Sequence, residues 1–184
     1  TQLRSISFTG EPRPISQMLP LGDKRSVMKQ AVRALHAVAP VPVDIIALPE
    51  KSPFGALVID SAGCTLCLAC VSSCPTGALG DNPDKPQLTF TEDACVQCGL
   101  CAATCPEKVI TLQPRMNFKA INAGPVVMKE EEPFHCITCS KPFGTKSTIE
   151  RVIKKLQGAH WMFSGADSAR VEMLKMCDDC RVGA

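Results

Sequence analysis

The chain has 184 residues, with 20 Lys and Arg against 18 Asp and Glu and a formal net charge of +2. That charge is too weak to favour a nucleic-acid partner, and no stretch approaches the ~20 apolar residues of a membrane-spanning helix. Seven Phe, one Trp and no Tyr leave few large aromatics for a core, whereas 12 Cys and 15 Pro are many for this length. We therefore expect metal sites to replace part of the core, and several small units rather than one large domain.

The cysteines also bear on the cellular compartment. All twelve stand in C-x-x-C pairs or runs, a spacing that favours metals and clusters over a dispersed disulfide framework. The chain opens on no charged and apolar leader segment. We predict a cytoplasmic protein and, because the sequence starts at Thr1 without an initiator Met, we expect it to be the C-terminal part of a longer polypeptide.

Residues 1–50 predict an extended arm followed by one amphipathic helix. Residues 1–22 are rich in Pro and Gly and show no sustained period. Asp23 is expected to cap a helix that runs to about Val38. His36 has no second ligand one turn away, so we expect a surface or hydrogen-bonded histidine. The apolar face of the helix would hold Val27, Ala31, Val32, Leu35 and Val38.

Residues 51–115 contain an internal repeat that extends from Phe54 to Leu112, with a constant offset between its two copies. Each copy is typical of a short strand, a cysteine loop that runs into a helical turn, and a second short strand, with a connector at 80–86. The cysteines coincide under this offset: Cys64, Cys67, Cys70, Cys74 and Pro75 fall on Cys95, Cys98, Cys101, Cys105 and Pro106.

The C-x2-C-x2-C spacing suits a 4Fe-4S cluster, because one short turn can bring three thiolates to three corners of the same cube. A distant cysteine has to supply the fourth ligand. Zinc is the alternative, but zinc sites use four ligands in two pairs, and three close cysteines followed by Cys-Pro fit that arrangement poorly. The residues between and after the ligands are mostly apolar, and such a shell lowers the potential of a cluster.

Residues 54–112 resemble a bacterial-type dicluster ferredoxin, with CTLCLACVSSCP and CVQCGLCAATCP matching the two ligand runs of that family. The resemblance implies a (βαβ)2 fold and two 4Fe-4S clusters close enough for electron tunnelling. In two-cluster ferredoxins the Cys before Pro in each run serves the other cluster. The implied ligand sets are Cys64, Cys67, Cys70 and Cys105 for cluster 1, and Cys95, Cys98, Cys101 and Cys74 for cluster 2.

Residues 116–184 predict a small α+β domain around a third set of cysteines. A capping box at Ser147–Glu150 would start one helix that Gly158 ends, and a second helix is expected over Asp167–Met176. Structural zinc is the predicted metal, with a rubredoxin-like iron or a third cluster as alternatives. Its ligands would come from two C-x2-C pairs on either side of these helices: Cys136, Cys139, Cys177 and Cys180.

The predicted fold class is α+β, with a ferredoxin-like (βαβ)2 dicluster module between an N-terminal arm and helix and a small C-terminal metal-knuckle domain. The predicted units are 1–50, 51–115 and 116–184. We predict an electron carrier or subunit, not itself an enzyme and without catalytic residues, that relays single low-potential electrons between redox partner proteins or oxidoreductase subunits.

Two other functions remain as alternatives. One is a redox enzyme subunit with its chemistry at the C-terminal cysteines, although no His and carboxylate constellation accompanies them. The other is a nucleic-acid-binding metal protein, for which the sequence offers only a thin basic and aromatic face made of Lys154, Lys155, His160 and Trp161.

Overall fold

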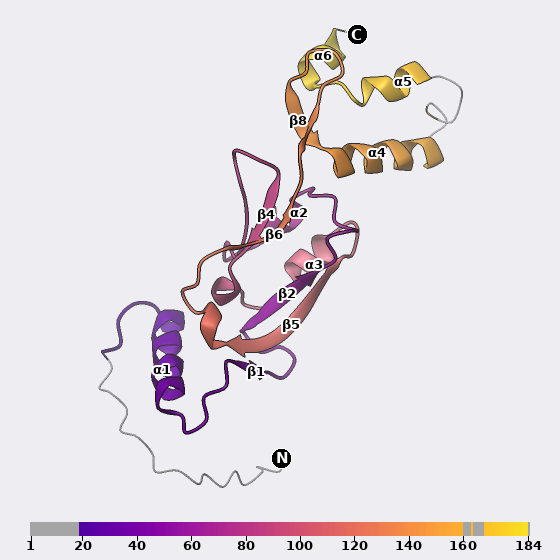
Figure 1. Ribbon diagram of the computed structural model, residues 1–184. Helices are drawn as coiled ribbons and strands as arrows, with labels where there is room; N and C mark the ends of the chain where they lie inside the picture. Colours follow the sequence, from indigo (N-terminus) through magenta and orange to yellow (C-terminus); the bar gives the residue numbers. More distant parts are fainter. Residues whose placement is uncertain (1–18, 160–162, 164–167, 184) are drawn as a thin grey trace.

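The structure is a computed structural model that describes residues 19–159, 163 and 168–183. Small antiparallel sheets and short helices make a mixed α and β architecture (Figure 1). Most of the predicted arm over residues 1–22 lies outside the described residues. Among the described helices, none combines the length and the apolar character that crossing a membrane would require.

The N-terminal helix, α1 (Lys24–Val38), begins and ends where the sequence predicts. The Asp23 carboxylate accepts the backbone N–H of Ser26 at 2.8 Å, and this bond satisfies one of the free N–H groups of the first turn. His36 also fits its prediction: its ring stacks on Phe118 with centroids 3.9 Å apart, and its Nε2 lies 3.1 Å from the carbonyl oxygen of Val43.

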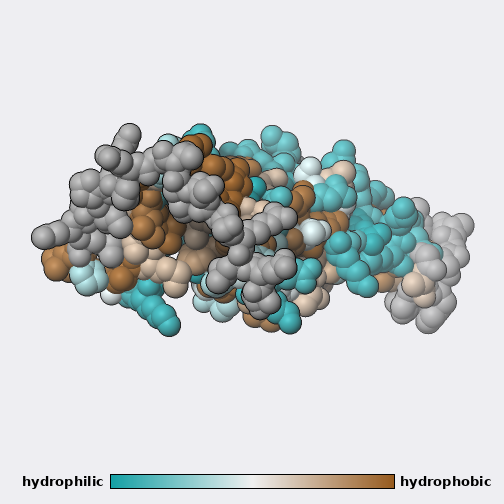
Figure 2. Space-filling view, turned by 90° about the horizontal axis from the view of Figure 1, so that it is seen from below, coloured by the Kyte–Doolittle hydropathy of each residue, from teal (hydrophilic) through white to brown (hydrophobic). Residues whose placement is uncertain are grey.

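The apolar face of α1 is less covered than its pattern predicts, because Leu35 is 55% exposed. Viewed from the end where α1 and β1 (Ile45–Ala47) lie, hydrophobic side chains gather on one half of the molecule (Figure 2). This end of the described chain exposes a series of large apolar residues: Leu19, Leu21, Met28, Leu35, Val41, Val43, Ile45 and Ile46.

The repeat folds as two copies of strand, helical turn and strand. The first copy comprises β2 (Gly55–Ile59), α2 (Ala69–Ser72) and β3 (Leu79–Asp81). The second comprises β4 (Gln87–Phe90), α3 (Leu100–Thr104) and β5 (Ile110–Asn117). The strands pair across the copies, β2 antiparallel with β5 and β3 antiparallel with β4. Neither copy therefore forms a sheet of its own.

The backbone repeats as closely as the sequence does. Residues with positive φ recur at the offset that relates the cysteines: Leu66 (52°) with Gln97 (54°), Leu68 (58°) with Gly99 (81°), and Gly77 (64°) with Lys108 (54°). Left-handed residues next to right-handed ones turn successive N–H groups toward one point, an arrangement that favours anions. The two cysteine loops thus have the same local geometry.

Two strands from outside the repeat complete its sheets, and the sequence predicted neither. β1 pairs antiparallel with the far end of β5, where Ile45 lies opposite Asn117. β6 (Val126–Glu130) pairs antiparallel with β4, with a bulge between Leu88 and Thr89. The sheet orders are β1–β5–β2 and β3–β4–β6. The division into units at residues 50 and 115 stays a prediction.

The hydrophobic core lies within the repeat. Leu88 is 1% exposed, and Ala78, Leu79 and Phe90 are also buried. Cysteines are part of this core, with Cys70, Cys95 and Cys101 each 8% exposed. The C-terminal region differs, because the buried apolar residues in its described part are cysteines, Cys136 and Cys177.

The C-terminal region consists of the hairpin β7 (Pro133–His135) and β8 (Pro142–Thr145), followed by the helices α4 (Lys146–Ala159), α5 (Ser168–Met173) and α6 (Asp178–Val182). In Figure 1 it occupies the end of the molecule opposite α1.

Three predictions about the helices of this region are wrong in detail. The first helix does not end at Gly158, because α4 runs through that residue to Ala159. α4 begins at Lys146, and its cap is Thr145, whose Oγ1 accepts the backbone N–H of Thr148 at 3.2 Å. Ser147, the predicted cap, instead donates from Oγ to the Glu131 carboxylate at 2.7 Å. The second helix ends at Met173 rather than at residue 176, and its predicted first residue, 167, lies outside the described residues.

Candidate metal centres

The first cavity lies between the loop that precedes α2 and the end of α3. Its cysteines are Cys64, Cys67 and Cys70 from the first copy and Cys105 from the second. Apolar side chains form much of the wall: Ile59, Leu66, Leu68, Leu88, Val109 and Ile110.

The second cavity mirrors the first, because it is lined by the equivalent loop of the second copy and by Cys74 of the first. Its cysteines are Cys95, Cys98 and Cys101 from the second copy and Cys74 from the first. Its wall is also largely apolar, with Leu57, Leu79, Leu100 and Leu112 among its residues. The cavities thus divide the eight cysteines into the two crossed sets that the resemblance implies.

Burial disfavours the thiolate at one cysteine of each run. Burial raises the pKa of Cys70 to about 11, and the other cysteines of its run add to the effect. Burial likewise raises the pKa of Cys101. At Cys74 burial acts in the same direction, but hydrogen bonds from the backbone N–H groups of Leu79 and Thr76 help to lower the pKa. Several thiolates in an apolar wall need a positively charged partner, and a metal supplies one.

The spacing of these sulfurs argues against single metal ions in the cavities. A tetrahedral zinc with Zn–S bonds of about 2.3 Å places its sulfurs about 3.8 Å apart. Among the described residues, only one group of three or more potential ligands gathers its atoms within 4.8 Å of one another, and it lies in the C-terminal region. The cavities therefore suit a larger body than one ion.

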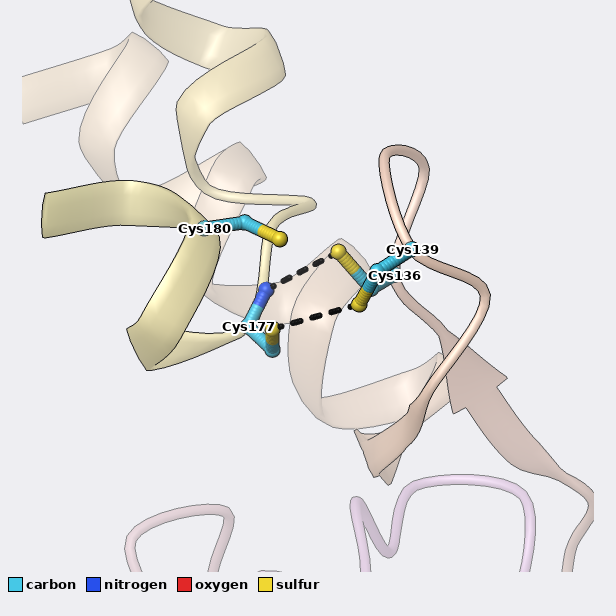
Figure 3. Close-up of side chains that lie close together, drawn as sticks. All are labelled: Cys136, Cys139, Cys177 and Cys180. Carbon is cyan, nitrogen blue, oxygen red and sulfur yellow. Dashed lines mark hydrogen bonds between the residues drawn. The ribbon is translucent and has the colours of Figure 1, made fainter. Parts of the chain in front are cut away.

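That compact group is Cys136, Cys139, Cys177 and Cys180. The first two come from the turn between β7 and β8; Cys177 caps α6 and Cys180 lies inside it. Figure 3 shows the four side chains turned toward a common centre. The sulfurs of Cys139 and Cys177 lie 3.6 Å apart, close to the edge of a tetrahedral metal site.

Backbone hydrogen bonds prepare one of these thiols for ionisation. Burial raises the pKa of Cys136, but the N–H groups of Cys139, Cys177 and Thr138 outweigh it and lower the pKa to about 6. The N–H of Cys177 lies 3.3 Å from the Cys136 sulfur (Figure 3). Hydrogen bonds with Cys139 and Cys177 raise the pKa of Cys180 to about 12. A metal that binds here therefore has to displace the Cys180 proton.

The four thiols suffice for a closed tetrahedral site. The adjacent His135 is exposed and does not belong to the group. Four protein ligands leave no open position for a substrate, which is typical of structural zinc rather than of catalytic zinc. The predicted four ligands thus come together, and the donor set fits zinc or a rubredoxin-like iron equally well.

The C-terminal region is tied to the first cavity. Thr145 Oγ1 and Thr148 Oγ1 both donate to the backbone carbonyl of Thr65, in the loop between Cys64 and Cys67. Arg151 and Lys155, from α4, form ion pairs with Glu107, a residue that lines the first cavity.

These contacts bear on the basic face considered for nucleic acid. Lys155 already has a carboxylate partner, at 3.6 Å from Glu107. His160 and Trp161 lie outside the described residues. Lys154, the other described residue of that face, is exposed.

Two cations from outside the repeat reach equivalent carbonyls, and sequence reasoning missed both. Arg25 of α1 donates from Nη2 to the carbonyl of Cys95 at 2.7 Å. Lys129 of β6 donates to the carbonyl of Cys64, the equivalent residue of the first copy. No local pattern marks these side chains, because the partners lie far apart in the sequence, by 70 positions for Arg25 and by 65 for Lys129.

Comparison with known families identifies what the two cavities belong to. Residues 63–110 match the model of a family described as the 4Fe-4S dicluster domain. This stretch is an iron–sulfur domain. The match covers about a quarter of the chain and includes all eight cavity cysteines, and it confirms the resemblance to a dicluster ferredoxin module. The C-terminal cysteines lie outside the dicluster domain.

A similar protein is the "Aliphatic sulfonate oxidoreductase, polyferredoxin-like subunit" of Pyrococcus furiosus. It is 40% identical to this chain over 40 residues, which make up 22% of this chain and 23% of that protein. The likeness thus spans less than a quarter of the relative's length. Together with the dicluster domain, it supports an iron–sulfur electron-transfer role for the chain.

Proposed function

We propose that the chain is an electron-transfer subunit that relays single low-potential electrons through two 4Fe-4S clusters. Cluster 1 would be held by Cys64, Cys67, Cys70 and Cys105, and cluster 2 by Cys95, Cys98, Cys101 and Cys74. The observation that carries the proposal is the division of these eight cysteines between two apolar cavities. The pairing of strands across the two copies supports a (βαβ)2 ferredoxin fold.

The residues around each cavity have defined tasks in this proposal. The cysteine sulfurs bind iron, and such a cluster takes up and releases one electron at a time. The apolar walls exclude water and disfavour the added negative charge, so they lower the potential. Left-handed residues in each loop favour N–H groups that converge on an anion, and such donors would oppose the effect of the walls.

For the C-terminal cysteines we propose one structural zinc, with a rubredoxin-like iron as the alternative metal. The support is the compact group of four sulfurs in a region whose buried apolar residues, in its described part, are themselves cysteines. A bound ion would replace the missing core. A closed set of four ligands also argues against chemistry at this site.

The proposed partners are redox proteins or the other subunits of an oxidoreductase, in the cytoplasm. The printed name of the Pyrococcus relative, a polyferredoxin-like subunit of an oxidoreductase, supports a subunit over a free carrier. The segments at either side of the dicluster domain exceed what electron transfer alone needs, and residues 19–46 expose several large apolar side chains. We propose that partner contacts lie on these flanking segments, and that they form the units 1–50 and 116–184.

Metal and sulfide analysis of the chain purified without oxygen tests the proposal. Two clusters require about eight iron and about eight sulfide per chain, and the C-terminal site adds about one zinc. Fewer than about five iron, or zinc alone, would contradict the two-cluster assignment. Iron at the C-terminal site in place of zinc would leave the assignment of the cavities intact and establish the rubredoxin-like alternative.

A further inference from the structure

At one position of the repeat, the two copies share the same backbone conformation but carry different kinds of side chain. Leu66 and Gln97 occupy equivalent places in the repeat, and their φ angles are 52° and 54°. Leu66 is 5% exposed and lines the first cavity. Gln97 instead carries a polar amide beside the second set of cysteines. The same place in the repeat thus holds an apolar side chain in the first copy and a hydrogen-bonding side chain in the second.

The amide of Gln97 reaches a cysteine sulfur of the second cavity. Its Nε2 donates to the Cys95 sulfur at 3.4 Å and to the backbone carbonyl of Ala56 at 3.0 Å. The Oε1 atom is buried and has no hydrogen-bond partner among the described residues. The reverse orientation of the amide would point Oε1 at two acceptors, so the NH₂ group has to face the sulfur.

The neighbouring strand leaves room for this contact. A Cβ atom at Gly55 would lie 2.6 Å from Cδ of Gln97, closer than real Cβ contacts allow. Gly55 begins β2, whose Ala56 accepts the other amide hydrogen bond. The strand therefore holds the Gln97 amide against the sulfur rather than leaving it free in solvent.

The cations at the equivalent cysteine carbonyls do not distinguish the two cavities. Arg25 donates to the carbonyl of Cys95, and Lys129 donates to the equivalent carbonyl of Cys64. Each copy thus has a cation at the same backbone atom. At the position of Gln97, in contrast, only the second copy has a donor.

We propose that Gln97 sets the order of the two potentials, so that the cluster of Cys74, Cys95, Cys98 and Cys101 is reduced before the other. The proposal rests on the two-cluster function above. Reduction adds one negative charge to a cluster, and an N–H donor to a ligand sulfur stabilises that charge. Leu66 has no donor to offer. An electron that enters the protein therefore rests on cluster 2.

The test is a redox titration of the full chain followed by EPR, with each signal assigned through hyperfine-shifted NMR resonances of its cysteines. Gln97→Leu copies the residue of the first copy. We expect it to lower the equilibrium constant for reduction of cluster 2 about threefold to tenfold. A tenfold change corresponds to about 59 mV for a one-electron couple. Cluster 1 should keep its potential.

The reciprocal variant, Leu66→Gln, should raise the potential of cluster 1 alone. The matched control is Gln113→Leu, because Gln113 is exposed on β5, opposite Ala56, and bonds Arg115 rather than a sulfur. Neither cluster should shift in this control. If the Gln97→Leu chain failed to bind cluster 2, two measurements would still test the role of Gln97. They are the order of the two potentials in the wild type and the potential of cluster 1 in Leu66→Gln.

Equal potentials in the wild type, or a potential of cluster 2 that Gln97→Leu leaves unchanged at full iron content, would overturn the role of Gln97. These results differ from a failure of the proposed function. A wild-type chain that binds no clusters would show too little iron and sulfide before any titration begins.

Discussion

The dicluster domain and the C-terminal region use cysteine in two different ways. In the dicluster domain, the cavities take their cysteines crosswise from both copies, and a core around Leu88 and Phe90 lies beside them. In the C-terminal region, two C-x2-C turns bring four sulfurs within 4.8 Å of one another. Bound clusters would join two halves that already share sheets, whereas a metal in the compact site would replace a missing core.

This difference predicts different responses to the loss of a ligand. Removal of one cavity cysteine should affect one cluster and leave the paired strands in place. Removal of one C-terminal cysteine should unfold the region around it, since little else in its described part is buried.

The largest effect is expected from Cys105→Ala. Cys105 follows α3 in the second copy but lines the cavity of the first. Its removal should release cluster 1, reduce the iron content from about eight to about four, and leave the NMR signals of Cys95, Cys98 and Cys101 in place. Iron analysis and NMR check this outcome.

Cys74→Ala is the matched control, because Cys74 occupies the equivalent place in the first copy. It should release cluster 2 and spare cluster 1. If Cys105→Ala instead disturbed the cysteines of its own copy, the crossed arrangement would be wrong.

A smaller but still large effect is expected from Cys180→Ala, which opens the C-terminal site. Structural zinc sites contribute about 10–16 kcal/mol of apparent binding free energy at pH 7. The variant should lose its zinc and the hydrogen-exchange protection of β8 and α6. The eight iron of the dicluster domain should remain, since none of its cysteines lies in this site. Loss of iron together with zinc would show that the two regions depend on each other for folding.

The smallest effect is expected from Gly99→Ala. Gly99 precedes α3 with φ +81°, and an added Cβ would meet Leu112 at an ordinary contact distance of 3.5 Å. The cost is therefore the left-handed backbone alone, about 1 kcal/mol. Loss of cluster absorbance in guanidinium should become about five times faster. An unchanged rate would show that this loop tolerates a side chain as readily as the first copy tolerates Leu68.

Local signals in the sequence were sufficient for much of the architecture. The repeat predicted both cysteine loops with their strands, and Asp23 predicted the start of α1. These features depend on residues a few positions apart, so their patterns can be recognised in the sequence. The grouping of the four C-terminal cysteines followed in the same way from two short C-x2-C spacings.

Contacts between distant segments could not be predicted where no cysteine motif marks them. β1 is too short to show a strand period. β6 follows the second copy in the sequence and pairs with β4, the first strand of that copy. The cap of α4 was misplaced because Ser147 found a carboxylate partner in Glu131, outside any local motif. The positions of Gln97 and of the cations at the Cys64 and Cys95 carbonyls also depend on the folded strands.

A reductive titration of the oxygen-free chain would show whether the two clusters transfer electrons. Each chain should take up two electrons in two one-electron steps at low potential, and reoxidation should restore the starting spectrum. Uptake of no electrons, or of one, by a chain with intact metal content would contradict two electron-transferring clusters in the cavities of the dicluster domain.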